Sequence, residues 1–221
     1  MSGKYHESNQ SISCSVCKQC GSCQYVDISY EKELKKKSAY LKQLFEGIYT
    51  CGEVHGMYRP VFYRNKVHAV VGLDKKKGIV TGTYAEGTHR LIPVDDCMIE
   101  DQKADSIIAT LRTLFASFKY APYNEDTHRG FMRHILIRRG FSTKEIMVVL
   151  VTADNKFPSK NNFIKALLEQ HPDITTIIQN INDLSTSMIL GKANKVLYGK
   201  GYIEDVPVSY THLTLPTNSR V

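Results

Sequence analysis

The stretch Cys14-Ser-Val-Cys-Lys-Gln-Cys-Gly-Ser-Cys23 places four of the six cysteines of this chain within ten residues. Thiolates are soft ligands that bind zinc, copper(I) and iron-sulfur clusters. Structural zinc sites usually combine two Cys-x-x-Cys pairs that are separated by a dozen or more residues. A compact run, completed by a ligand from a distant part of the chain, is typical of iron-sulfur clusters. The run therefore predicts a metal site, and its spacing favours an iron-sulfur cluster over zinc.

Length and composition set limits on the class of protein. The chain has 221 residues, of which 42% are hydrophobic and 23% charged, as in ordinary globular proteins. No apolar run approaches the roughly 20 residues of a membrane span, and the polar N-terminus lacks the apolar centre of a signal peptide. We therefore expect a cytoplasmic protein with no membrane partner. The net charge of +7 indicates a polyanionic partner, although it is a weak sign of one.

Periodicity predicts an α+β fold with a mostly antiparallel sheet and flanking helices. A helix capped by Asp27 or Ser29 should run to Gly47. Further helices are expected at 104–118 and 158–168, and strands at 63–73, 78–84, 89–94, 131–137, 146–152, 174–181, 188–190 and 196–202. The first three strands should form an antiparallel meander, and the last two a hairpin around Gly191. Cys97 follows the meander directly.

Two polar motifs suggest active sites but have simpler explanations. Asn180-Ile-Asn-Asp183 follows a predicted strand, where Asn and Asp are common turn formers. Gly199-Lys-Gly201 lacks the other residues of a phosphate-binding loop. No Gly-x-Gly-x-x-Gly motif follows a strand and opens a helix, so the sequence predicts no nucleotide or S-adenosylmethionine pocket.

Several motifs occur along the chain in the order found in one known family. They are Cys14-x5-Cys20-Gly-Ser-Cys23, Pro60-x2-Tyr63-Arg-Asn-Lys66, Tyr84-x-Glu-Gly-Thr-His89, Arg133-His134 with Arg138, Pro158-Ser-Lys-Asn-Asn162, Gln179-Asn-Ile-Asn-Asp183 and Leu197-Tyr-Gly-Lys-Gly-Tyr-Ile-Glu-Asp205. With these motifs the chain resembles the RNA uracil-C5 methyltransferases, in particular the bacterial enzymes that methylate a uridine of large-subunit (23S) ribosomal RNA.

The resemblance implies a 4Fe-4S cluster held by Cys14, Cys20, Cys23 and Cys97. Cys17 falls in a gap where the family motif requires no cysteine. Spacing alone favours the four clustered cysteines, with Cys51 and Cys97 as the only candidates for a ligand from outside the run. Zinc in a purely structural site is the alternative metal.

The resemblance also implies an S-adenosylmethionine-dependent enzyme with a Rossmann-like catalytic domain, in which a cysteine attacks the flipped-out uracil. No such domain is evident here, so we expect residues 14–206 to be an iron-sulfur central domain. On this interpretation the chain is a fragment without catalytic residues and is inactive alone, and S-adenosylmethionine binds only to the full-length enzyme. The alternative function is a stand-alone iron-sulfur module that binds RNA or senses redox state.

Four basic residues follow from the resemblance as candidate contacts to the RNA backbone: Arg64, Lys66, Arg133 and Arg138. Each could equally be a solvated surface charge. The expected partner is ribosomal RNA, and the chain is expected to be a monomer. Residues 1–13 should be flexible, and residues 207–221 resemble a translated sequencing adapter rather than native sequence.

Overall fold

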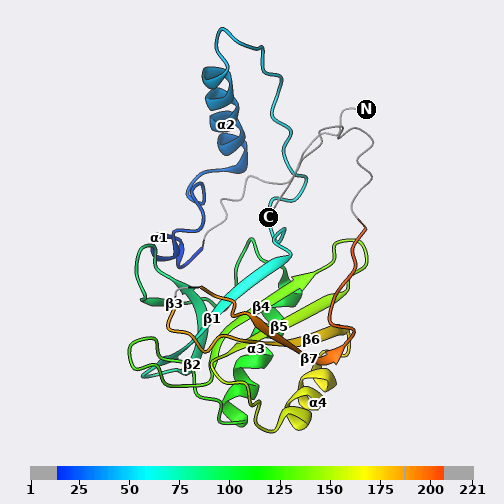
Figure 1. Ribbon diagram of the computed structural model, residues 1–221. Helices are drawn as coiled ribbons and strands as arrows, with labels where there is room; N and C mark the ends of the chain where they lie inside the picture. The colour runs from blue at the N-terminus through cyan, green and yellow to red at the C-terminus, as the bar shows by residue number, and fades with distance from the viewer. Residues whose placement is uncertain (1–13, 187, 207–221) are drawn as a thin grey trace.

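A seven-stranded sheet forms the centre of the computed structural model, which describes residues 14–186 and 188–206 (Figure 1). Its strands lie in the order β3-β2-β1-β4-β5-β6-β7. The strands are β1 Lys66–Asp74, β2 Gly78–Tyr84, β3 Leu91–Pro93, β4 Met132–Arg139, β5 Ile146–Thr152, β6 Ile174–Ile181 and β7 Ala193–Gly199. The helices are α1 Cys17–Cys20, α2 Tyr30–Leu44, α3 Gln102–Ser117 and α4 Lys160–Gln170. The expectations for residues 1–13 and 207–221 lie outside the described residues.

Strands β1, β2 and β3 form the antiparallel meander predicted from the sequence. The β1–β2 turn is closed by Asp74, whose Oδ1 accepts hydrogen bonds from the backbone N–H groups of Lys76 and Lys77. Gly78 follows with a φ of 76°, a conformation that glycine adopts without steric cost. Local turn chemistry therefore explains this hairpin.

The predicted mostly antiparallel sheet of an iron-sulfur domain is corrected to a mixed sheet, because β5 and β6 pair in parallel. A parallel pair needs a crossover, and α4 supplies it between β5 and β6. The expected hairpin around Gly191 is also wrong. Residues 188–190 form no strand, and β7 pairs with β6 instead.

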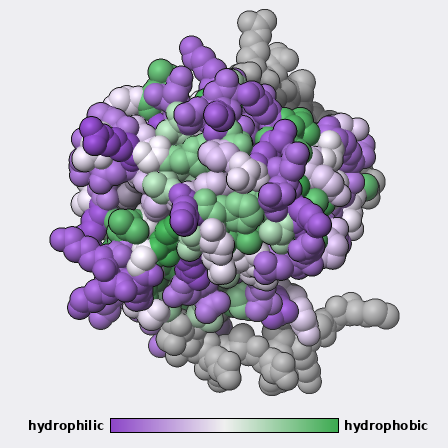
Figure 2. All heavy atoms as spheres, turned by 90° about the horizontal axis from the view of Figure 1, so that it is seen from below, coloured by the Kyte–Doolittle hydropathy of each residue, from purple (hydrophilic) through white to green (hydrophobic). Residues whose placement is uncertain are grey.

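Helices α3 and α4 cover one face of the sheet and build the main core with it. On β1, the alternate residues Val67, Ala69 and Val71 are buried against these helices, as strand periodicity requires. Leu111 and Phe115 of α3 are fully buried in the same core. Seen from the α3 and α4 side of the molecule, the outer surface alternates hydrophilic side chains with small apolar patches (Figure 2).

Helix α2 projects from the sheet at the opposite end of the molecule (Figure 1). Ser29 caps it by accepting a hydrogen bond from the Lys32 N–H, as predicted, but none of its residues is buried. The returning chain contacts it near both ends: the Met57 N–H donates to the Tyr30 hydroxyl at 2.8 Å, and the Cys51 Sγ lies 3.6 Å from the Leu41 carbonyl oxygen. Within residues 14–186 and 188–206, none of the helices combines the length and apolar character that a membrane crossing requires.

Candidate functional site

The sheet opens where β1 and β2 diverge. Their pairing ends at Val70 and Gly82. Beyond this point the first residues of β1 pair only with β4, and the last residues of β2 pair only with β3. The space between the two strands is therefore free to receive another segment of the chain.

The cysteine-rich segment lies at this opening and, together with residues of β1 and β2, lines a pocket of about 230 Å³. Five thiols line it together: Cys14, Cys17, Cys20, Cys23 and Cys97. The fold thus brings Cys97 to the N-terminal run, as the resemblance implied. Cys51 lies away from the pocket, in the segment that follows α2, where its Sγ donates to the Leu41 carbonyl at 3.6 Å.

Local geometry explains how the thiols converge. Cys17 and Cys20 begin and end the single turn of α1, and Gly21 ends that turn with a φ of 69°. The Cys97 N–H donates to the Asp105 Oδ2 at 3.2 Å, which ties the thiol-bearing segment to the first turn of α3. Asp101 caps α3 by accepting from the N–H groups of Lys103 and Ala104.

The thiols are close, but they are not arranged as a ready ligand set. Among the residues that the structure describes, no group of three or more His, Cys, Asp or Glu side chains is placed so that it could hold a metal ion. The expected 4Fe-4S cluster is therefore not supported. The assignment of Cys14, Cys20, Cys23 and Cys97 as metal ligands remains a prediction.

Burial raises the pKa of several acidic groups in the pocket. It raises the pKa of the Cys97 thiol to about 11. Burial, followed by the negative charge of Asp105, raises the pKa of Glu100 to about 7, against the opposing effect of Arg64. Burial also raises the pKa of Asp105 and of Cys23. Partial desolvation at this site therefore disfavours the charged forms of its acidic groups.

Three of the four predicted RNA contacts lie at this end of the sheet. Arg64 and Lys66 line the thiol pocket, and Lys66 pairs in register with Arg138 across β1 and β4. All three residues are exposed. The structure therefore brings them together on one surface, next to the cysteines.

Arg133 lies elsewhere and points inward, with 1% of its side chain exposed. Its guanidinium donates to both carboxylate oxygens of Glu125 at 3.0 Å and to the carbonyls of Asn182 and Leu184. The centroid of the Tyr123 ring lies 4.4 Å from the Arg133 Cζ. Arg133 is therefore not a solvated surface charge, and its guanidinium presents no free face to a phosphate in this conformation.

Sequence reasoning missed the non-cysteine residues of the pocket. Glu100, Asp105 and His68 line it. The acidic residues on either side of Cys97 in the sequence could have indicated Glu100 and Asp105. No sequence pattern indicated His68. The Nε2 of His68, on β1, lies 3.2 Å from the Nδ1 of the buried His134 on the neighbouring strand β4. The two imidazoles therefore form a pair across these strands.

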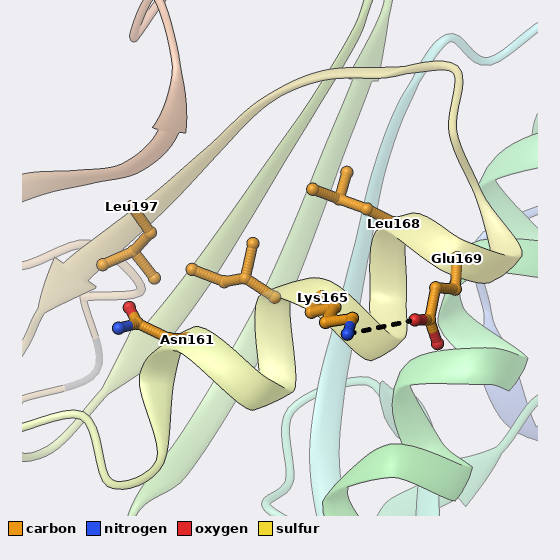
Figure 3. Close-up of a pocket in the computed structure, with 6 residues that line it drawn as sticks. Asn161, Lys165, Leu168, Glu169 and Leu197 are labelled. Atoms are coloured by element: carbon orange, nitrogen blue, oxygen red, sulfur yellow. Dashed lines mark ion pairs between the residues drawn. The ribbon is translucent and has the colours of Figure 1, made fainter.

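A second hollow is an open groove of about 460 Å³ along α4 (Figure 3). Ile164, Leu168 and Leu197 form its apolar lining. Lys165 and Glu169 face each other at its rim, with 4.0 Å between Nζ and Oε1. Because Lys165 and Glu169 are exposed and pair with each other, this groove is the weaker candidate.

Comparison with known proteins gives a consistent result. The chain is 38% identical over 192 residues to an uncharacterized RNA methyltransferase of Oceanobacillus iheyensis, a match that covers 84% of this chain and 42% of the relative. It is 40% identical over 196 residues to an uncharacterized RNA methyltransferase of Clostridium tetani, covering 87% and 42%. The chain is related to the RNA methyltransferases. It spans less than half the length of these relatives, and no protein-family model matches it.

The fold is shared with a solved methyltransferase. The Pyrococcus abyssi tRNA (uracil-54, C5)-methyltransferase, solved in complex with S-adenosyl-L-homocysteine, matches 85% of this chain and 43% of its own with a TM-score of 0.64 at 23% identity. These matches overturn three expectations: that the methyltransferase fold is missing, that the chain is a fragment defined by an iron-sulfur cluster, and that it is inactive for lack of a catalytic domain.

Proposed function

We propose that this RNA methyltransferase relative transfers a methyl group from S-adenosylmethionine to carbon 5 of a uridine in RNA. The observation that carries the proposal is the match of 85% of the chain to the fold of a tRNA uracil-C5 methyltransferase solved with S-adenosyl-L-homocysteine. The RNA methyltransferase relatives at 38–40% identity support the same class of reaction.

The chemistry replaces the proton on carbon 5 of uracil with the methyl of the sulfonium donor. S-adenosylmethionine supplies that methyl as an electrophile, S-adenosyl-L-homocysteine leaves, and the carbon-5 proton is released. No glycine-rich turn of the kind that cradles a nucleotide lines either hollow of the described chain. We therefore assign no residue to the cofactor and no residue to catalysis.

We further propose that large-subunit ribosomal RNA is the substrate, on the strength of the motifs between Cys14 and Asp205. Arg64, Lys66 and Arg138 are the proposed contacts to its backbone, since their exposed cations gather on one surface beside the pocket. A cytoplasmic location is part of the same proposal.

The test is methyl transfer by the purified chain from S-[methyl-³H]adenosylmethionine to unmodified transcripts of 23S ribosomal RNA and of tRNA. We expect label in the ribosomal transcript, recovered as 5-methyluridine by mass spectrometry of the digested RNA, and inhibition by added S-adenosyl-L-homocysteine. Label in tRNA alone would contradict the ribosomal substrate. Label in neither transcript, or in a base other than uracil, would contradict the proposed reaction.

A further inference from the structure

The far end of the sheet, where β4 begins and β5 ends, carries loops fixed by an aromatic cluster. Tyr120, Phe131 and Phe157 contact one another with ring centroids 5.2–5.5 Å apart. The backbone strengthens this arrangement, because the Phe131 N–H donates to the Ala121 carbonyl and the Ala153 N–H donates to the Phe131 carbonyl. Three segments distant in sequence are thus held as one rigid surface.

Exposed cations lie close in sequence to the members of this cluster. Lys119 precedes Tyr120, Arg129 lies two residues before Phe131, and Lys156 and Lys160 flank Phe157. A fifth cation, Lys195 of β7, reaches the same surface because its Nζ donates to the Asn155 carbonyl at 3.4 Å. We call these five exposed residues, Lys119, Arg129, Lys156, Lys160 and Lys195, the basic rim.

The cations of the basic rim are left without ion pairs in the described chain. None of its five cations forms an ion pair there, whereas Lys103, Arg112 and Lys200 each pair with a carboxylate. The nearby Glu125 is already occupied by Arg133. Asp126 and Asp154 lie in the same loops and offset part of the charge, and the Asp154 Oδ1 accepts from the Lys156 N–H.

We propose that the basic rim binds the phosphate backbone of the RNA substrate, an inference that rests on the proposed function. Unpaired lysines spread over a rigid surface suit a repeating polyanion, which needs charge at intervals and no apolar anchor. A protein partner would need an apolar centre to its interface, and here the aromatic rings beneath the cations are engaged with one another.

The basic rim is separate from Arg64, Lys66 and Arg138. Those residues lie near the start of β1 and the end of β4, whereas the basic rim lies where β4 begins. The eight residues of β4 span roughly 25 Å at about 3.4 Å per residue. The RNA would therefore contact the domain at two places along the sheet, and both sets of cations would contribute to its affinity.

The test compares two triple variants that remove the same charge. Lys119→Gln, Lys156→Gln, Lys160→Gln alters the rim, and Lys32→Gln, Lys36→Gln, Lys42→Gln alters exposed cations of α2. Affinity for fluorescein-labelled 23S ribosomal RNA fragments is measured between 50 and 200 mM salt by anisotropy. We expect the rim variant to bind roughly tenfold more weakly, with a slope of log K against log salt that is shallower by about 2. The α2 variant should change little in either quantity. A Lys→Arg triple at the rim should retain wild-type binding.

An effect of the rim variant no larger than that of the α2 variant would overturn the inference, as would a wild-type chain that does not bind the RNA. If the rim variant lost as much affinity for polyglutamate as for RNA, the rim would bind polyanions in general, and the inference would be overturned as well. Methyl transfer is measured in parallel. Rim-dependent binding without methylation would overturn the proposed function alone, and methylation with rim-independent binding would overturn the rim alone.

Discussion

Arg133 has the largest fully buried side chain among the described residues, and it joins two loops to the start of β4. Replacing it with Met would leave the Asn182 and Leu184 carbonyls without donors and Glu125 without its partner. We expect a loss of roughly 2–4 kcal/mol in the free energy of unfolding, measured with urea. Glu125→Gln should cost less, because Glu125 is partly exposed. Equal stability of Arg133→Met and wild type would contradict this role.

His134 makes stability depend on pH. Burial, assisted by the charges of His68 and Arg133, lowers its pKa to about 3. The unfolded chain therefore takes up this proton first, and the free energy of unfolding should fall as pH drops from about 6.5 toward 3. Urea unfolding at pH 7 and pH 5 measures this, and His134→Gln should flatten the dependence. The exposed His55 is the control, so His55→Gln should leave the slope unchanged.

The thiol pocket makes a testable distinction between two cysteines that spacing alone could not separate. Cys97 lines the pocket and Cys51 does not. If Cys14, Cys20, Cys23 and Cys97 are ligands, protein purified without oxygen should contain a thiophilic metal that Cys97→Ser loses and Cys51→Ser keeps. Atomic absorption for iron and zinc measures it. Metal-free wild-type protein would reject the ligand assignment.

At the scale of elements, the β2–β3 pairing depends on close backbone approach. A Cβ added at Gly82 would lie 1.9 Å from the Ile92 carbonyl oxygen, so only glycine fits there. We expect Gly82→Ala to lower the free energy of unfolding by about 1–3 kcal/mol, the usual cost of overpacking. Gly52→Ala, where nothing lies within 4 Å of the added Cβ, should change it little. The urea midpoints of the two variants decide the comparison.

At the scale of the whole molecule, the segment that follows β7 is anchored to the β4–β5 loop. The Asp205 carboxylate accepts from the N–H groups of Phe141 and Ser142, and these bonds lower its pKa. The anchor should therefore hold above about pH 4 and weaken as pH falls through the lowered pKa. Asp205→Asn should speed hydrogen exchange at Phe141 and Ser142, read by mass spectrometry. Asp183→Asn, at an exposed site, should not.

Local pattern predicted much of the element list, and its failures have a physical cause. The bounds of β2, β5 and β6 follow directly from apolar runs between turn residues. The parallel β5–β6 pair and the β6–β7 pair could not be predicted from local pattern. Strand pairing depends on where the α4 crossover places β6 in the sheet and on which edge of β6 is then left for β7. The inward turn of Arg133 was equally hidden, since its partners lie 49 and 51 residues away.

The sequence by itself determined the strands and helices, the concentration of thiols and the resemblance to RNA methyltransferases, because these depend on local periodicity and short motifs. Spacing left both Cys51 and Cys97 open and the resemblance implied Cys97, whereas the tertiary structure places Cys97 in one pocket with the N-terminal cysteines, where the pairing of β1 and β2 has ended. It also decided which cations remain unpaired. Ion pairing and burial depend on residues far apart in the chain, which come together only in the fold.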